Sequence, residues 1–304
     1  MRPLTLAYSS CPNDTFIFHA LAHKLLKIDK SSNLEITDYS DSLYSIDSKY
    51  APEFEITIAD VETLNQHARN SLFDITKLSF ATFSVLRNEY ALLRTGAALG
   101  RGCGPLVVSL PQKKINEKTV IAVPGKGTTA FVLFSLFIKE TFPEFKPYII
   151  PMPFEKIMPA VKDGVADFGV IIHEGRFIYQ NLGLDCLVDL GEWWERFTGL
   201  PIPLGCIAIK RSVYRNDPKL AFKVEQLIRQ SIQHAFDHPE SGRDYIKAHA
   251  QEMDDDVIRQ HIHLYVNNFS KDIGDEGEAA IFTFFQKAEE AGIINPSSDT
   301  IFAC

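Results

Sequence analysis

The sequence lacks the features that mark exported, membrane-spanning and nucleic-acid-binding proteins. No apolar run approaches the ~20 residues that a helix needs to cross a bilayer. The amino-terminal segment MRPLTLAYSS has neither the apolar core nor the small-residue cleavage site of a signal peptide. The formal net charge of -8 argues against nucleic acid or an anionic membrane as partner. A small anionic substrate stays compatible with this charge, because one local pocket can oppose the overall sign.

Cysteine is also scarce, and its pattern argues against a disulfide framework. The five cysteines are odd in number and never occur in C-x-x-C spacing. Scattered thiols of this kind are typical of a reduced, cytoplasmic protein, which is the location we expect. No group of Cys, His and Asp residues has the spacing of a zinc site, and we expect neither a metal nor a cofactor.

Strand and helix patterns alternate along the chain, which favours an α/β fold. Strands are predicted at residues 4–8, 34–39, 74–79, 106–108, 120–123, 148–151, 168–172 and 201–209. Helices are predicted at residues 15–26, 60–68, 128–140 and 154–162, and in the tail around 220–235 and 281–288.

A chain of 304 residues is longer than a typical single domain, so we expect two lobes. The strand at 201–209 is expected to return the chain to the first lobe. Residues 1–107 plus 208–304 would then form lobe 1, and residues 108–207 would form the inserted lobe 2. Strands near Val107 and Ile207 are expected to run side by side as the hinge.

A buried strand pattern at 168–172 ends on His173, and polar residues follow it. Open α/β sheets bind their ligands at the carboxyl ends of strands, and imidazole titrates near neutrality, as a general base requires. Glu174 and Arg176 either orient His173, bind substrate or form a surface ion pair. The alternative is a histidine that is hydrogen-bonded to a neighbour at the edge of the core.

Three further strand ends carry polar groups. The turn PGKGTTA at 124–130 precedes an apolar helix whose first amides and dipole favour an anion, although threonine capping alone explains the turn equally well. Its spacing is not that of a Walker phosphate loop. The turn SSCPNDT at 9–15 is similar, with Asn13 or Asp14 expected as the helix cap, and Lys77 with Ser79 ends another strand.

Two other features receive structural interpretations. His261 and His263 lie two residues apart in a helical stretch and face different sides, so a metal pair is not expected. The aromatic pair Trp193 and Trp194 is interpreted as packing, with a wall of the cleft as the alternative.

Seven ordered motifs together resemble the 1,4-dihydroxy-6-naphthoate synthase family of the futalosine route to menaquinone. The motifs are YSSCPNDTF at 8–16, DVETLN at 60–65, DITKLS at 74–79, GAALGRG at 96–102, PGKGTTA at 124–130, IIHE at 171–174 and DLGEWW at 189–194. The resemblance extends from about residue 4 to 211. Ser10 departs from the family pattern, which usually has proline there, and Gly175 stands where serine is usual.

The resemblance implies a two-lobed fold like that of type II periplasmic binding proteins, with substrate in the cleft between the lobes. It implies a cytoplasmic lyase that converts a small anionic substrate, cyclic dehypoxanthine futalosine, to 1,4-dihydroxy-6-naphthoate. His173 is the implied proton acceptor. The implied substrate contacts are Asn65, Lys77, Leu78, Ser79, Thr129 and Ala130. The sequence carries no signal of an oligomeric state.

Three alternatives remain open from the sequence. A chorismate dehydratase-like enzyme of the same pathway is not expected to combine the SCPND turn with the IHE segment. A solute-binding protein of the same fold would need export, which the missing signal sequence argues against. A ligand-sensing module of a regulator would need a basic DNA-binding segment, which we do not find.

Overall fold

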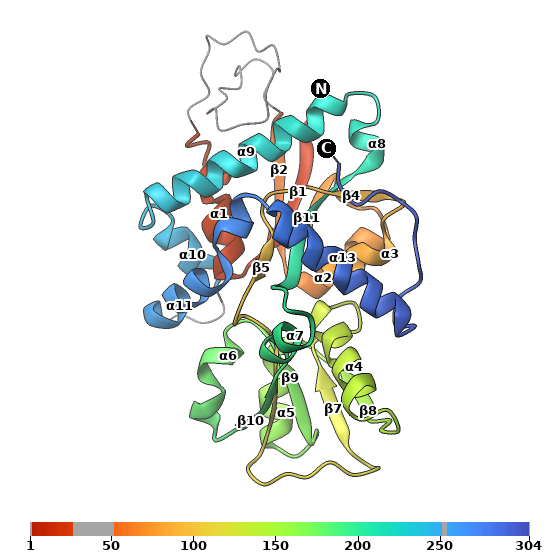
Figure 1. Ribbon diagram of the computed structural model, residues 1–304. Coiled ribbons are helices and arrows are strands. Elements are labelled where there is room, and N and C mark those ends of the chain that lie inside the picture. Colours follow the sequence, from red (N-terminus) through yellow and green to blue (C-terminus); the bar gives the residue numbers. More distant parts are fainter. Residues whose placement is uncertain (1, 27–51, 251–253, 304) are drawn as a thin grey trace.

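The computed structural model describes residues 2–26, 52–250 and 254–303. Two β-sheets lie end to end, each with helices packed around it (Figure 1). The larger sheet and most of the helices form the upper half of the view, and the smaller sheet with α4 to α7 forms the lower half. The chain is therefore α/β, as predicted.

The larger sheet has the strand order β2-β1-β3-β11-β4, and β5 also pairs with β11. Strand β1 runs parallel to β2 and β3, whereas β11 is antiparallel to β3, β4 and β5. The bounds are Leu4–Ser9 for β1, Phe54–Ala59 for β2, Ile75–Ser79 for β3, Tyr90–Leu92 for β4, Ala98–Gly100 for β5 and Ile202–Lys210 for β11.

The smaller sheet has the order β10-β6-β9-β7-β8. Strand β7 is parallel to β8 and β9, and β6 is antiparallel to β9 and β10. The bounds are Leu106–Ser109 for β6, Val120–Val123 for β7, Tyr148–Pro151 for β8, Phe168–Ile171 for β9 and Asp185–Asp189 for β10.

The helices cover both sheets, and α1 packs against α9, α10 and α11 at one side of the larger sheet. None of the helices in the described ranges combines the length and hydrophobicity that a bilayer crossing requires. Their bounds are α1 Pro12–Ala22, α2 Val61–Arg69, α3 Phe80–Val85, α4 Thr129–Thr141, α5 Phe154–Lys162, α6 Gly175–Ile178, α7 Leu190–Thr198, α8 Arg211–Tyr214, α9 Pro218–Asp237, α10 Arg243–His249, α11 Asp255–Tyr265, α12 Asn268–Lys271 and α13 Gly274–Glu290; a 3-10 turn spans Tyr179–Leu182.

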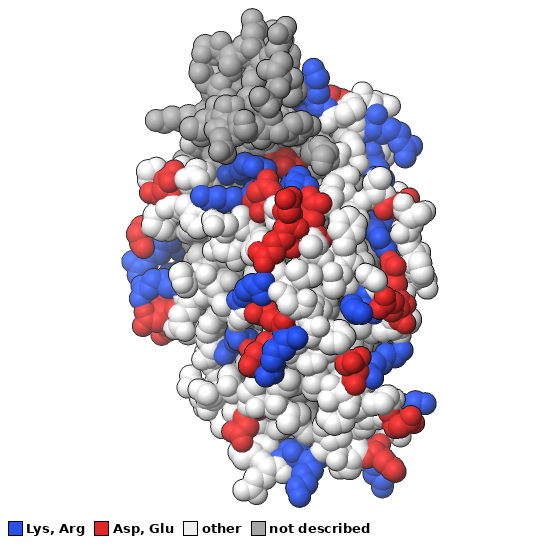
Figure 2. All heavy atoms as spheres, viewed as in Figure 1, with Lys and Arg blue, Asp and Glu red and all other residues white. Residues whose placement is uncertain are grey.

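Local sequence explains where several helices begin. Asp60 accepts hydrogen bonds from the amides of Glu62 and Thr63 and so caps α2. Asp189 caps α7 in the same way, and that helix ends at Gly199, whose φ of 76° is the left-handed conformation that glycine adopts at little cost. The charged surface is mixed in sign: Figure 2 shows basic and acidic side chains interspersed on the face viewed.

Most predicted elements are confirmed, and β7, β8 and α5 have the predicted bounds. The packing role of Trp194 is confirmed too: its side chain is fully buried and Nε1 donates to the carbonyl of Pro201. The strand predicted at 34–39 lies outside the described residues. Strand β2 at Phe54–Ala59 was not predicted, although FEITIA has the alternation of a half-buried strand.

The prediction that the strands near Val107 and Ile207 run side by side is wrong. Val107 pairs with Val170 in the smaller sheet, whereas Ile207 pairs with Lys77 in the larger one. At the beginning of β11 the neighbouring strand is β5, where Gly100 opposes Ile202. The chain leaves the larger sheet at β5 and needs the following glycine-rich turn before it enters β6. The division into lobes at residues 107 and 208 itself stays a prediction.

Candidate functional site

A cavity lies where the carboxyl ends of β1, β3 and β9 approach the amino-terminal end of α4. Strand ends from both sheets contribute to it, so the cavity combines residues from the two halves of the molecule. The lining residues that carry polar side chains are Ser9, Asn13, Asp14, Lys77, Ser79, Thr128, Thr129, His173, His261 and Tyr265.

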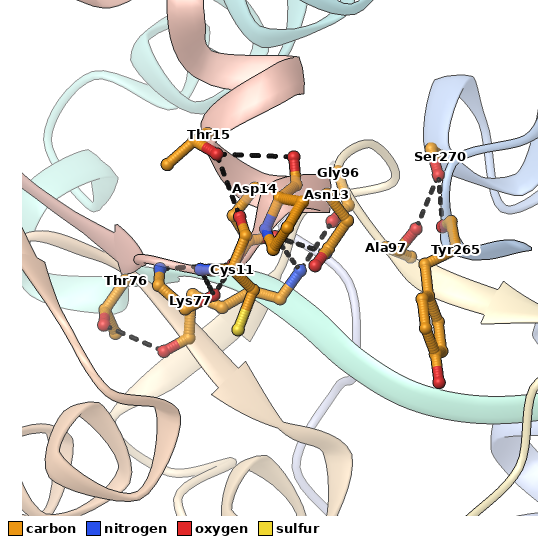
Figure 3. A network of polar contacts seen from close by, with 12 residues as sticks. Cys11, Asn13, Asp14, Thr15, Thr76, Lys77, Gly96, Ala97, Tyr265 and Ser270 are labelled. Carbon is orange, nitrogen blue, oxygen red and sulfur yellow. Dashed lines mark hydrogen bonds and ion pairs between the residues drawn. The ribbon is translucent and has the colours of Figure 1, made fainter. Parts of the chain in front are cut away.

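A buried ion pair forms one wall of the cavity. Nζ of Lys77 lies 2.7 Å from Oδ1 of Asp14, and both side chains are almost completely buried. Asp14 also accepts hydrogen bonds from the hydroxyl of Ser9 (2.6 Å) and from Nδ2 of Asn13 (2.9 Å). Figure 3 shows Lys77 of β3 meeting Asn13 and Asp14 of α1. The contacts neutralise the carboxylate and explain why Asp14 is not the cap of α1, whose N-cap is Cys11.

His261 extends this network toward His173. Its Nε2 lies 3.0 Å from Oδ1 of Asn13, and the residue is 1% exposed. Burial lowers the pKa of His261 well below its ordinary value, and the nearby His173 lowers it further. The two imidazole rings are nearly parallel, with an interplanar angle of 15° and centroids 6.3 Å apart.

His173 follows the last residues of β9 and faces the turn between β1 and α1. Its φ of 55° places a non-glycine residue in the left-handed region, which costs about 1–2 kcal/mol. Sγ of Cys11 lies 3.3 Å from its Nδ1 and 3.8 Å from its Nε2. The ring of Phe154 packs edge-on against the imidazole at 4.7 Å. Sheet, thiol and aromatic ring together fix the position of this side chain.

The amino-terminal end of α4 forms another part of the cavity wall. Thr128 caps the helix by accepting from the amide of Phe131. The hydroxyl of Thr129 donates to the carbonyl of Leu204 (2.7 Å) and accepts from the amide of Ala81 (3.3 Å). Within the described part of the chain, the amides of Thr129 and Ala130 have no acceptor. Free amides and the helix dipole make this end a suitable site for an anion.

Of the seven predicted site residues, five line the cavity: the proton acceptor His173 and the substrate contacts Lys77, Ser79, Thr129 and Ala130. Asn65 and Leu78 are not lining residues. Asn65 is buried behind Ser79, with Oδ1 accepting from the Ser79 amide (2.9 Å) and Nδ2 donating to its hydroxyl (3.0 Å). Leu78 is fully buried in the core. The roles of all seven residues stay predictions.

Glu174 and Arg176, the two charged residues that follow His173 in the sequence, do not pair with each other. Arg176 donates to Asp189 (2.6 Å) and to the carbonyl of Gly104 (2.7 Å), so it ties α6 to the beginning of α7. Glu174 is 5% exposed, and its Oε2 has no hydrogen-bond partner among the described residues. Arg176 therefore serves the structure, and it is not the partner of Glu174.

Sequence reasoning missed Asp14 as a partner of Lys77, Cys11 as a neighbour of His173, and both cavity residues of α11, His261 and Tyr265. The latter are four residues apart, which places them on one face of a helix. This i, i+4 spacing could have indicated from the sequence that His261 and Tyr265 share one face of the helix. In the ranges that the structure describes, no cluster of three His, Cys, Asp or Glu side chains is arranged to hold a metal ion.

Two curated proteins resemble the chain over nearly its whole length. The 1,4-dihydroxy-6-naphtoate synthase of Streptomyces coelicolor is 42% identical over 96% of this chain and 94% of its own. The enzyme of the same name from Thermus thermophilus is 41% identical over 99% of this chain and 100% of its own.

Three solved structures superpose on this chain and identify its fold. A protein from Archaeoglobus fulgidus superposes with a TM-score of 0.80 at 29% identity, covering 96% of this chain and 98% of its own. A Candida albicans protein described as having the generic periplasmic binding protein fold gives 0.63 at 12% identity, covering 98% and 93%. The aliphatic sulphonate binding protein of Escherichia coli gives 0.63 at 11% identity, covering 98% and 90%. The fold is thus that of the periplasmic binding proteins.

A family profile described as menaquinone biosynthesis matches residues 4–290, which is most of the chain. This match includes both sheets, all the cavity residues and the helices of the tail. Together with the near-complete alignments to two synthases, it shows that this chain belongs to the menaquinone biosynthesis family.

Proposed function

We propose that this protein is a carbon–carbon lyase that converts cyclic dehypoxanthine futalosine to 1,4-dihydroxy-6-naphthoate in menaquinone biosynthesis. The observation that carries the proposal is the identity of 41–42% to two synthases of that name across almost the whole chain. A cavity lined by a histidine and by a helix amino terminus supports it.

The carboxylate of the substrate binds at the amino-terminal end of α4 in this proposal. The free amides of Thr129 and Ala130 donate to the carboxylate oxygens, and the helix dipole adds to the attraction. Lys77 attracts the carboxylate less than an unpaired lysine would, because its charge is already neutralised by Asp14. Its main effect is to hold the β1–α1 turn in place beside Ser79, which also lines the cavity.

His173 is the general base of the proposed reaction. Elimination requires a group that removes a proton near neutral pH, and imidazole does so without a metal. The residue stands at the end of a buried strand, and its ring is held between Cys11 and Phe154. Such support fixes the direction of the base relative to a ligand that is held at α4.

The two sheets form the two lobes of this enzyme, and the substrate lies between them. We place the crossing segments at β5 and β11, next to the boundaries first expected at residues 107 and 208. The proposed substrate is small and anionic, and the proposed location is the cytoplasm.

Conversion of the substrate by the purified protein tests the proposal. The chain is incubated with cyclic dehypoxanthine futalosine, and 1,4-dihydroxy-6-naphthoate is measured by chromatography with mass detection. Chorismate serves as the second substrate, because a chorismate dehydratase-like enzyme is the alternative in the same pathway. Formation of the naphthoate supports the proposal; dehydration of chorismate alone refutes it.

A further inference from the structure

His261 occupies a position in the site that the proposed reaction does not yet use. It lies on α11, more than 80 residues after His173, yet both histidines line the same cavity with their rings nearly parallel. His261 is 1% exposed, so its polar atoms need hydrogen-bond partners from protein or ligand.

The hydrogen-bond network fixes which nitrogen of His261 carries its proton. Asp14 is paired with Lys77 and acts as an acceptor, so the group that Asn13 turns toward it is the amide Nδ2 (2.9 Å). The carbonyl Oδ1 of Asn13 must then face His261, at 3.0 Å from Nε2. Because Oδ1 only accepts, Nε2 is the protonated nitrogen. Nδ1 therefore carries a lone pair.

This Nδ1 is a buried acceptor without a donor. None of the described residues places a hydrogen-bond donor within reach of it. Leaving such an acceptor unpaired is unfavourable, and native structures rarely do so without a ligand or water that supplies the donor. Burial also keeps the ring neutral. Nδ1 can therefore accept a hydrogen bond, but it repels the oxygens of an anion.

We propose that Nδ1 of His261 accepts a hydrogen bond from a hydroxyl group of the bound ligand. His261 is then a specificity-determining contact, and the cavity offers two chemically different contacts. The amides of Thr129 and Ala130 select a carboxylate, while His261 selects a neutral donor. A ligand with both groups can bind in one orientation only. The identity of the ligand rests on the proposed function; the preference for a hydroxyl rests on the geometry.

Two ligands that differ only in hydroxyl groups test this inference. 1,4-Dihydroxy-6-naphthoate and 2-naphthoate share the ring system and the carboxylate, and the second lacks both hydroxyls. Their affinities are measured by anaerobic titration calorimetry for the wild type, for His261→Phe and for the matched control His263→Phe. His263 is an exposed histidine two residues along the same helix.

We expect the wild type to prefer the dihydroxy compound by about 3- to 10-fold, the contribution of one hydrogen bond. His261→Phe should lose this preference and still bind 2-naphthoate within about twofold of the wild type. His263→Phe should keep the preference. A folded His261→Phe protein that retains it, or a wild type that has none, overturns the inference.

Nitrogen NMR of histidine-labelled wild-type protein gives a second readout that does not depend on the folding of a variant. The resonances of His261 should show a protonated Nε2 and an unprotonated Nδ1, and the Nδ1 resonance should shift with the dihydroxy ligand but not with 2-naphthoate. A protonated Nδ1, or equal shifts with both ligands, overturns the proposal. The conversion assay remains a separate test, so an active enzyme that fails here refutes only the role of His261.

Discussion

Sγ of Cys11 lies 3.3 Å from Nδ1 of His173, although the two residues are 162 positions apart in the chain. The contact joins the β1–α1 turn of one sheet to the end of β9 in the other. Burial raises the pKa of the Cys11 thiol well above its ordinary value, and the charges of Glu174 and Asp14 raise it further. The sulfur is thus a neutral thiol, and the pair is not the thiolate–imidazolium couple of a cysteine nucleophile.

This neutral thiol predicts a pattern of chemical modification. Among the cysteines that the structure describes, Cys186 is exposed, whereas Cys11, Cys103 and Cys206 are buried. Alkylation requires an accessible thiolate, so iodoacetamide at pH 8 should modify Cys186 at least about tenfold faster than the other three. Peptide mass spectrometry over time measures the rates, with the urea-unfolded chain as the control. Equal rates at Cys11 and Cys186 would contradict the buried, neutral thiol.

The buried pair of Lys77 and Asp14 predicts a large loss of stability when one partner is removed. Lys77→Met leaves the Asp14 carboxylate buried without its cation and should lower the free energy of unfolding by about 3–5 kcal/mol. The double variant Lys77→Met with Asp14→Asn should lose less than Lys77→Met alone. The control is Arg259→Met, which breaks an exposed pair with Asp256 and should cost less than about 1 kcal/mol.

Urea unfolding of the four proteins measures these differences. A loss below 1 kcal/mol for Lys77→Met would mean that water reaches Asp14 and replaces the lysine, contrary to the burial of both side chains.

The close approach of Gly104 and Gly191 predicts a second stability effect. A Cβ on Gly104 would lie 2.1 Å from the amide nitrogen of Gly191, so the backbones must separate. The connection between β5 and β6 would then lose its fit against α7, including the bond from the Leu190 amide to the Pro105 carbonyl. Gly104→Ala should cost about 2 kcal/mol or more.

The matched control is Gly175→Ala, because a Cβ there meets its nearest atoms at an ordinary 3.5 Å. Thermal or urea unfolding compares the two variants. If Gly104→Ala is as stable as Gly175→Ala, the contact between the two glycines is looser than the structure has it.

Local patterns were enough to predict the strand ends that build the cavity. The apolar run before His173, the alternation before Ser79 and the glycine turn before Thr129 each indicate a strand that ends in polar groups. Carboxyl ends of strands are where α/β sheets bind ligands, so the candidates followed from local sequence. The family resemblance then implied their roles.

Contacts between distant segments could not be predicted in this way. Asp14 has the sequence position of a helix cap, but its carboxylate binds Lys77, 63 residues away, because a buried ion pair satisfies both groups more completely than a cap would. From the sequence, His261 and His263 were expected only to lie on different sides of one helix. The place of His261 in the cavity follows from the packing of α11 against α1, and nothing in the local pattern of either helix specifies that packing.

Thr129 predicts an effect on ligand binding that acts through the position of α4. Its hydroxyl joins α4 to Leu204 and Ala81, which belong to the other half of the molecule. Thr129→Val keeps the shape and removes both hydrogen bonds, so binding of 1,4-dihydroxy-6-naphthoate should weaken by about 1–2 kcal/mol. Thr129→Ser keeps the hydroxyl and should bind nearly as well as the wild type. Unchanged affinity in a folded Thr129→Val protein would show that these two hydrogen bonds do not position the α4 amides for the ligand.

The strongest test of the proposed mechanism is His173→Asn. Asparagine tolerates the left-handed backbone that residue 173 adopts, with φ of 55°, better than most residues do. The substitution therefore removes the imidazole with little added backbone strain, which alanine or glutamine would not ensure. His263→Asn is the matched control, since that histidine is exposed on α11.

The asparagine side chain can donate and accept hydrogen bonds, but it cannot take up a proton near neutral pH. If His173 is the general base, turnover of cyclic dehypoxanthine futalosine should fall by about 10²–10⁴-fold. Affinity for 1,4-dihydroxy-6-naphthoate should change far less, because the lost interaction belongs to the transition state. Single-turnover product formation and ligand titration separate the two effects. A folded His173→Asn protein with near-normal turnover would show that the base is another group, and the neutral His261 ring, whose centroid lies 6.3 Å from that of His173, would then be the first to examine.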